Sequence, residues 1–184
     1  TDTDSDTDTD SDTDTDSDTD TDSDTDADTD TDSDSDSDSE LLAFSGAEGF
    51  GRYASGGRGG EVFHVLNLND SGSGSFRDAV SQPNRIVVFD VGGIIKITDR
   101  IVIKKNIHIA GQTAPGGGIT IYGNGIAFND DSGNNIVRYI RIRMGKNGDS
   151  GKDAVAISAG QNYMFDHVSI SWGRDGTLDV NGTG

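Results

Sequence analysis

The feature that most constrains the fold is a repeat of short segments with apolar residues at alternate positions. Three such blocks begin at Asn106, Asn135 and Asn162, at intervals of 29 and 27 residues. A period of roughly 20–50 residues is typical of stacked repeat architectures. If the repeats stack in register, equivalent Asn side chains lie above one another and their amides can form a hydrogen-bonded ladder. The repeat predicts a right-handed parallel β-helix, and the alternative is a sandwich in which three similar strands recur by chance.

Most of residues 41–184 has the pattern of short strands separated by Gly, Asn and Asp turns. The expected strands are 86–91, 94–98, 101–111, 118–123, 125–128, 135–145, 153–158, 162–173 and 177–180. One short helix is expected at 74–83, with Ser75 as its N-cap and Pro83 as its stop. This composition of elements predicts an all-β domain.

The first 39 residues alternate Ser, Thr or, once, Ala with Asp. This alternation provides no apolar face to bury, and the charges repel one another, so residues 1–40 are predicted to be a disordered acidic linker. They carry 20 of the chain's 33 acidic groups and none of its 14 Lys and Arg, which leaves 13 acidic against 14 basic groups in residues 41–184. A calcium-binding array is the alternative, but the segment 1–39 lacks the Gly and Glu of an EF-hand loop.

Several classes of protein are excluded by what the sequence lacks. There is no Cys, so no disulfide framework or thiolate metal site can form. No run of 18 or more apolar residues is present, so we expect no membrane partner. The Gly-rich stretch 46–60 lacks the nucleotide-binding pattern GxxxxGK[ST], and we expect no nucleic-acid partner. Because the chain starts at Thr1 and ends in DVNGTG, we expect a piece of a longer protein.

Long ordered blocks then resemble one known family. The stretches 43–80, 87–97, 106–123, 138–145 and 165–180 resemble, in order, the pectate lyases of polysaccharide lyase family 1. The resemblance covers essentially all of residues 43–184. It implies a single-stranded, pectin-lyase-like β-helix, with residues 41–184 as the N-terminal portion of the lyase domain. It also implies a secreted, monomeric enzyme that acts on pectate (polygalacturonan) and is joined by the acidic linker to an upstream module.

Near the end of the chain, Asp175 and Asp179 stand four apart around Gly176. A straight strand would separate their Cα atoms by roughly 13 Å, but a bend at Gly176 could bring the two carboxylates together. The resemblance implies that they bind Ca²⁺ together with Asp153, with Asp149 as a further candidate ligand. Calcium prefers six to eight oxygen ligands in irregular geometry, and the alternative for each residue is a solvated surface Asp.

Four further residues stand close to this acidic group in the sequence. The pair Asp166 and His167 is expected to be structural, and the alternative is a base role for His167, since His titrates near neutral pH. Trp172 is expected either to stack on a sugar or to pack. Arg174 could hold a substrate carboxylate in a bidentate contact or balance the charge of the acidic pair.

The resemblance implies β-elimination, in which an Arg abstracts the C5 proton of the uronate. In the family that Arg follows the acidic pair, so its position lies beyond Gly184, no catalytic residue is assigned in this chain, and the chain alone is expected to be inactive. One alternative is a pectin lyase or another glycan lyase, although pectin lyases usually lack the three carboxylates. Others are a hydrolase, for which only the acidic stretch 129–131 offers a candidate, and a non-catalytic glycan-binding β-helix.

Overall fold

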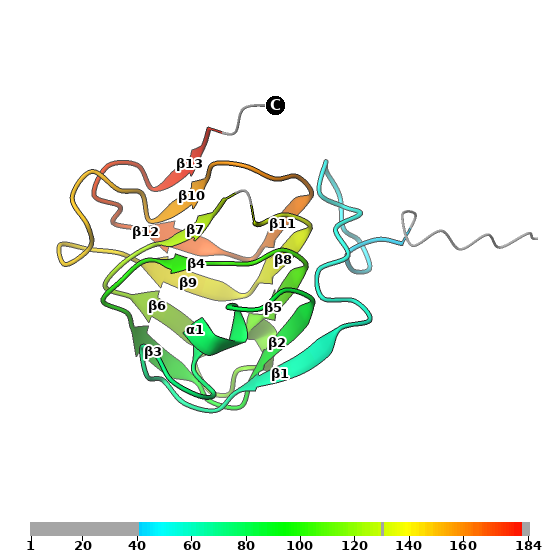
Figure 1. Ribbon diagram of the computed structural model, residues 1–184, viewed down its shortest axis with the longest axis horizontal. Coiled ribbons are helices and arrows are strands. Elements are labelled where there is room, and N and C mark those ends of the chain that lie inside the picture. Colours follow the sequence, from blue (N-terminus) through cyan, green and yellow to red (C-terminus); the bar gives the residue numbers. More distant parts are fainter. Residues whose placement is uncertain (1–40, 130, 182–184) are drawn as a thin grey trace, which may run out of the picture. The chain divides into compact units, whose positions relative to one another are not determined.

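The computed structural model describes residues 41–129 and 131–181, so the predicted acidic linker 1–40 lies outside the described residues. The described chain winds through three sheets in which every pairing is parallel (Figure 1). Sheet A contains β1 (Glu61–Val65), β2 (Arg85–Phe89), β5 (Ile107–Ala110), β8 (Asn135–Arg138) and β11 (Tyr163–Asp166). Sheet B contains β3 (Gly93–Lys96), β6 (Ile119–Tyr122), β9 (Ile140–Arg143) and β12 (Ser169–Ser171). Sheet C contains β4 (Ile101–Val102), β7 (Ile126–Phe128), β10 (Val155–Ile157) and β13 (Leu178–Val180).

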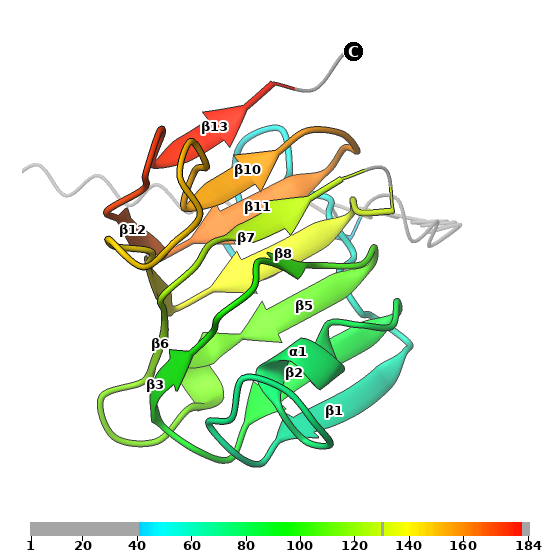
Figure 2. The same ribbon diagram turned by 60° about the vertical axis from the view of Figure 1, so that its left-hand side comes forward.

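From β4 onward, each coil passes through sheet C, then sheet A, then sheet B, and strands of successive coils stack on one another (Figure 2). A short 3₁₀-helix, η1 (Gly111–Thr113), follows β5. The predicted parallel β-helix is therefore confirmed. None of the helices in the part of the chain that the structure describes is long and apolar enough to cross a membrane.

The core lies inside the coils and is built from columns of β-branched side chains. In sheet B, for example, Ile95, Ile121 and Ile142 stack in register, and each is fully buried. Burying one such side chain contributes about 1.5–3 kcal/mol, and branched side chains pack well on a pleated surface. The alternating pattern read from the sequence thus corresponds to the inward and outward faces of each strand.

Three of the predicted strands are wrong in extent, because each is two strands in different sheets. The stretch 135–145 divides at Tyr139 (φ 55°), and 162–173 divides at His167 (φ 54°). The stretch 101–111 divides between β4 and β5, where Asn106 has φ 56°. The left-handed backbone at these corners turns the chain from one sheet to the next, while the apolar alternation continues across the corner and conceals it in the sequence.

The other predicted elements are placed nearly as expected. The helix α1 (Phe76–Ala79) is shorter than predicted and ends before Pro83. Ser75 is its N-cap, as predicted, and its Oγ accepts a hydrogen bond of 3.2 Å from the Asp78 amide. The strand β1 was not predicted from the sequence.

The predicted Asn ladder exists and includes Asn106 as predicted, but its member in the next coil lies one residue earlier than predicted. Asn106 Nδ2 donates to Asn84 Oδ1 at 2.7 Å, and Asn134 Nδ2 donates to Asn106 Oδ1 at 3.0 Å. The ladder therefore contains Asn134 rather than the predicted Asn135. Asn135 points into the core with no exposed surface, and its Oδ1 accepts from the Ile107 amide at 2.7 Å. Adjacent Asn residues look equivalent in the sequence, and only the stacking of coils distinguishes them.

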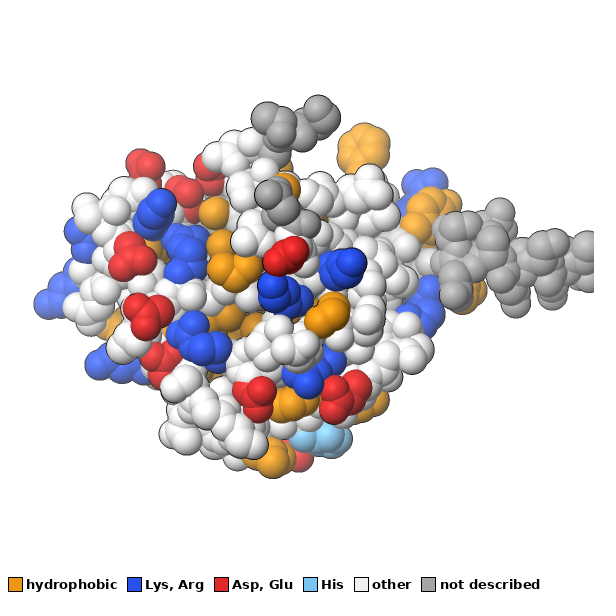
Figure 3. Space-filling model, viewed as in Figure 1, with side chains coloured by type: hydrophobic (Ala, Val, Ile, Leu, Met, Phe, Trp, Pro, Cys, Tyr) orange, Lys and Arg blue, Asp and Glu red, His pale blue; other side chains and the backbone are white. Residues whose placement is uncertain are grey.

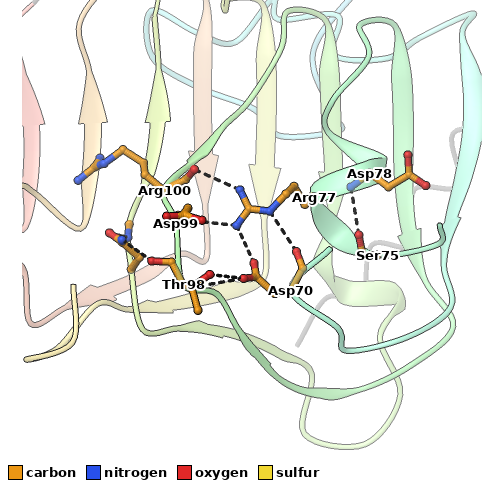
Figure 4. Close-up of polar contacts among 9 residues, drawn as sticks. Asp70, Ser75, Arg77, Asp78, Thr98, Asp99 and Arg100 are labelled. Atoms are coloured by element: carbon orange, nitrogen blue, oxygen red, sulfur yellow. Dashed lines mark hydrogen bonds and ion pairs between the residues drawn. The ribbon is translucent and has the colours of Figure 1, made fainter. Parts of the chain in front are cut away.

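A polar network joins α1 to the turn before β4 (Figure 4). Arg77 extends from α1 and donates to Asp70 Oδ1 at 2.6 Å, and also to the carbonyl oxygens of Asp99 (2.8 Å) and Arg100 (3.2 Å). Asp70 Oδ2 accepts from both the amide and the hydroxyl of Thr98. The network fixes the backbone from which the Arg100 side chain extends.

Candidate functional site

The strand β13 places Asp179 on the outer face of sheet C. Its neighbours Leu178 and Val180 pair in register with Val155 and Ile157, whose side chains are buried in the core. Successive side chains in a strand point to opposite faces. Asp179 therefore projects outward, and it is half-buried.

Gly176 lies between Asp179 and Asp153. Its amide donates a hydrogen bond of 2.6 Å to Asp153 Oδ1. A Cβ atom at position 176 would lie 2.4 Å from Asp153 Oδ1 and 3.9 Å from Asp179 Cβ. A side chain at position 176 would have to displace the Asp153 carboxylate, so Gly176 keeps Asp153 and Asp179 on either side of the same turn.

The other two predicted ligands do not join this pair. Asp175 is exposed, its amide donates to the Lys152 carbonyl at 3.1 Å, and Asp149 is exposed in the connection that leads to β10. Within residues 41–129 and 131–181, no three carboxylate or His side chains lie close enough together to hold one metal ion. The structure thus brings together two of the four carboxylates singled out in the sequence.

Arg100 is a neighbour of the site that the sequence did not reveal. Its Nη2 donates to the Asp153 carbonyl at 2.5 Å and its Nη1 to the Ile126 carbonyl at 3.1 Å, while its Nε is buried without a partner among the described residues. Burial lowers the pKa of the Arg100 guanidinium, and the charges of Asp153 and Asp149 act in the opposite direction. Nothing in the sequence around Arg100 indicates that its side chain contacts Asp153, so this neighbour of the site could be found only from the fold.

Trp172 and Arg174, two residues apart, lie in the first half of the connection between β12 and β13. Arg174 Nη1 donates to the carbonyl oxygens of Lys146 and Gly148, so this side chain stabilises the neighbouring connection. It makes no ion pair with any carboxylate in the described part of the chain. Trp172 is 64% exposed and adopts φ 64°, and the Arg143 guanidinium lies 5.9 Å from its ring centroid.

Asp166 and His167 form a hydrogen-bonded pair at the corner between sheets A and B. His167 Nδ1 lies 2.7 Å from Asp166 Oδ1, and Arg138 contacts Asp166 Oδ2 at 2.7 Å. Burial tends to raise the pKa of Asp166, but the hydrogen bonds from Arg138 and His167 outweigh it and lower that pKa. The His167 ring also stacks on Tyr139 with centroids 4.5 Å apart. These contacts support β12, the strand that leads towards the site formed by Asp153, Gly176 and Asp179, which we call the acidic turn.

The chemistry of the acidic turn fits a hard cation. In Figure 3, acidic side chains gather at the upper left, near β10 and β13, with basic side chains beside them. The donors at Asp153 and Asp179 are carboxylate oxygens, which Ca²⁺ prefers, and their partial exposure leaves room for water. One oxygen of Asp153 already accepts the Gly176 amide. Two carboxylates beside the half-buried Arg100 would hold such an ion weakly, with most ligands supplied by water or by a bound carboxylate.

Comparisons with known proteins agree with this fold. No protein-family model matches the chain. It is similar to "Probable pectate lyase C" from Aspergillus flavus, with 68% identity over 144 residues that cover 77% of the chain and 34% of the relative. The protein of the same name from Emericella nidulans is 63% identical over 145 residues, which cover 78% of the chain and 34% of the relative. The chain therefore spans about a third of the length of these curated relatives.

A solved structure shows the same architecture. The crystal structure of jun a 1, the major allergen from cedar pollen, matches with a TM-score of 0.63 and 21% identity over 74% of this chain and 46% of that protein. At this identity the likeness establishes the fold alone. The relatives from Aspergillus flavus and Emericella nidulans are much more similar in sequence and are named probable pectate lyases. They confirm the resemblance to the pectate lyases that the sequence indicated, over a region that corresponds to about a third of those proteins.

Proposed function

We propose that this chain is the N-terminal part of a secreted, calcium-dependent pectate lyase that cleaves polygalacturonate by β-elimination. The observation that carries the proposal is the identity of 68% with a protein named a probable pectate lyase. The pairing of Asp153 with Asp179 around Gly176 supports the calcium requirement. Residues 1–40 would then join this domain to an upstream module, and the substrate would be a polyuronate chain.

The acidic turn would contribute binding and orientation rather than proton transfer. Bound Ca²⁺ would neutralise the carboxylate of a uronate and so acidify its C5 proton. Asp153 and Asp179 would hold the ion, with Asp175 and Asp149 contributing if the turns close around it. Arg174 would keep the 146–148 turn in place beside the site, because it donates to two carbonyl oxygens there.

The exposed end of the β-helix supports the proposal that further coils belong to the complete protein. The inward-facing side chains Leu178 and Val180 are 49% and 67% exposed, whereas their equivalents one coil earlier, Val155 and Ile157, are 0% and 7% exposed. They border a hollow of about 720 Å³ whose other walls include Tyr163 and Phe165. One more coil stacked on β13 and β11 would bury this apolar surface and would be the place for the catalytic Arg.

The lyase reaction leaves a C4–C5 double bond conjugated with the carboxylate, so ultraviolet absorbance tests the proposal directly. We expect the full-length protein to release such products from polygalacturonate, to lose activity with a calcium chelator and to regain it when Ca²⁺ is restored. Residues 1–184 alone should be inactive. Activity that a chelator does not affect would favour a pectin-lyase-like enzyme, and a folded full-length protein without activity on any uronan would favour a glycan-binding β-helix.

The metal assignment can be tested separately by calorimetry on the full-length protein. Asp153→Asn and Asp179→Asn should each weaken Ca²⁺ binding, because each removes a charged oxygen ligand. Asp175→Asn should weaken it less, because Asp175 does not join this pair. Asp99→Asn is a matched control, since Asp99 is exposed and lies outside this group. Unchanged Ca²⁺ affinity in the three variants would refute the assignment.

A further inference from the structure

The outer face of sheet B is basic and aromatic, and the function proposed above does not use it. The register of β3, β6, β9 and β12 aligns two outward rows along the β-helix. These rows consist of Ile94, Thr120, Arg141 and Ser169, and of Lys96, Tyr122, Arg143 and Ser171. Trp172 follows the second row directly. We call Lys96, Tyr122, Arg141, Arg143 and Trp172 the basic face (Figure 2 shows its strands β3, β6 and β12).

No acidic side chain balances this charge within the sheet. The four strands contain no Asp or Glu. Lys96 and Arg141 are exposed, and neither forms an ion pair with any residue in the described ranges. Arg143 donates instead to the carbonyl and the hydroxyl of Ser169, both at 2.7 Å, and lies near the Trp172 ring. The face therefore presents free cationic donors beside exposed aromatic surface.

A hollow beside Arg141 gives the basic face a place for a sugar ring. It has a volume of about 420 Å³ and lies between the loop 115–118 and the strands β3 and β6. The Arg141 guanidinium borders it, with Nη1 3.7 Å from a Cβ built on Gly118. Ile94 and Thr120 also line it, so apolar and hydroxyl surface lies next to a cation.

We propose that the basic face binds a polyuronate chain and so gives the protein a second attachment surface for the substrate class of its proposed function, on which this inference rests. Strands in a sheet lie about 4.8 Å apart, so Lys96 and Arg143, two strands apart, are separated by about 10 Å along the row. This spacing suits carboxylates on a linear uronan that runs along the β-helix. Arg binds carboxylate through two parallel hydrogen bonds, and Tyr and Trp offer flat amphipathic surface to pyranose rings.

The surface differs in sign and position from the acidic turn. Asp153 and Asp179 belong to the connections and outer face of sheet C and attract cations, whereas the basic face attracts the carboxylates directly. Binding to the basic face should therefore not require Ca²⁺. A titration with the uronan in the presence of a chelator therefore distinguishes binding at the two surfaces, because the chelator removes only the calcium-mediated contact.

The test is a calorimetric titration of the whole 184-residue chain with de-esterified polygalacturonate in the presence of a chelator. The double variant Lys96→Gln/Arg141→Gln should bind about tenfold more weakly, because it removes two charge-assisted contacts. The double variant Arg52→Gln/Lys105→Gln is the matched control: it removes the same charges at exposed positions outside sheet B and should bind like the parent chain. Trp172→Ala should also weaken binding, and circular dichroism and thermal unfolding verify that each variant is folded.

Three results would overturn the inference: no chelator-resistant binding, equal loss in the control variant, or equal affinity for a sulfated dextran, which would indicate an unselective polyanion surface. Fully methyl-esterified pectin should bind much more weakly than the uronan, since it lacks the carboxylates. Lyase activity of the full-length protein without binding at this face would refute this inference alone. Binding at this face in a full-length protein without lyase activity would refute the proposed function alone.

Discussion

The amide of Gly176 donates a hydrogen bond of 2.6 Å to Asp153 Oδ1, which is 23 residues earlier in the chain and lies on the adjacent coil of the β-helix. This contact joins the turn before β13 to the connection before β10. It orients one carboxylate of the proposed calcium site, and a Cβ atom at position 176 would displace that carboxylate, because it would lie 2.4 Å from the accepting oxygen.

Gly176→Ala should therefore disturb the acidic turn. The added methyl group must displace either the turn or the Asp153 carboxylate, which should lower the free energy of unfolding by about 1–3 kcal/mol and weaken Ca²⁺ binding in the full-length protein. Gly117→Ala is the control, since a Cβ atom there meets no atom within 4 Å. Chemical denaturation and calorimetry measure the two effects, and equal behaviour of the two variants would contradict the structure.

The Asn ladder predicts that different substitutions of Asn134 lower the free energy of unfolding by different amounts. Asn134 adopts φ 54° and hydrogen bonds to both Asn106 and Ser55, so Asn134→Ala should lose about 1–2 kcal/mol for the left-handed backbone and a further 1 kcal/mol or so for the bonds. Asn134→Gly should avoid the left-handed penalty, and it should lose the bonds and a smaller amount for the greater conformational entropy of Gly in the unfolded chain. The difference between the two variants in urea denaturation isolates the backbone cost, and a more stable Ala variant would rule out the left-handed conformation.

His108 should make the domain less stable in mild acid. Burial, aided by the charge of Arg138, lowers the pKa of His108 to about 4, whereas an unfolded His titrates near its usual 6.5. The unfolded chain then binds more protons between these values, so the free energy of unfolding should fall by about 1–2 kcal/mol from pH 7 to pH 5. His108→Gln should flatten this dependence. Urea denaturation at several pH values measures it, and identical slopes for the two proteins would exclude His108 as the cause.

The network around Asp70 should contribute stability that is lost in stronger acid. Burial would raise the pKa of Asp70, but hydrogen bonds from Arg77 and Thr98 outweigh it and lower that pKa (Figure 4). A lowered folded-state pKa gives stability that is present above the usual carboxyl range and lost as pH falls through the folded value. Asp70→Asn should cost about 1–2 kcal/mol at pH 7. Thermal unfolding tests this against Asp99→Asn, whose side chain is exposed, and a loss of equal size in both would contradict the assigned role.

The architecture could be predicted from the sequence, because the repeat from Asn106 and the alternation of Ile and Val are local patterns that stacked coils satisfy. The sequence also singled out Asp153 and Asp179, through the resemblance to pectate lyases. It could not place the corners at Tyr139 and His167, because alternation continues through them and the left-handed backbone there has no signal in residue type.

Which residues meet across coils could be seen in the tertiary structure alone. The stacking of β5 on β8 selected Asn134 for the ladder and sent Asn135 into the core, although the two are adjacent and identical. The stacking of β4, β7 and β10 in sheet C brought Arg100 to the Asp153 carbonyl, 53 residues away. Contacts of this kind depend on the register between coils, which is set by the length of every connection along the chain and not by any one segment.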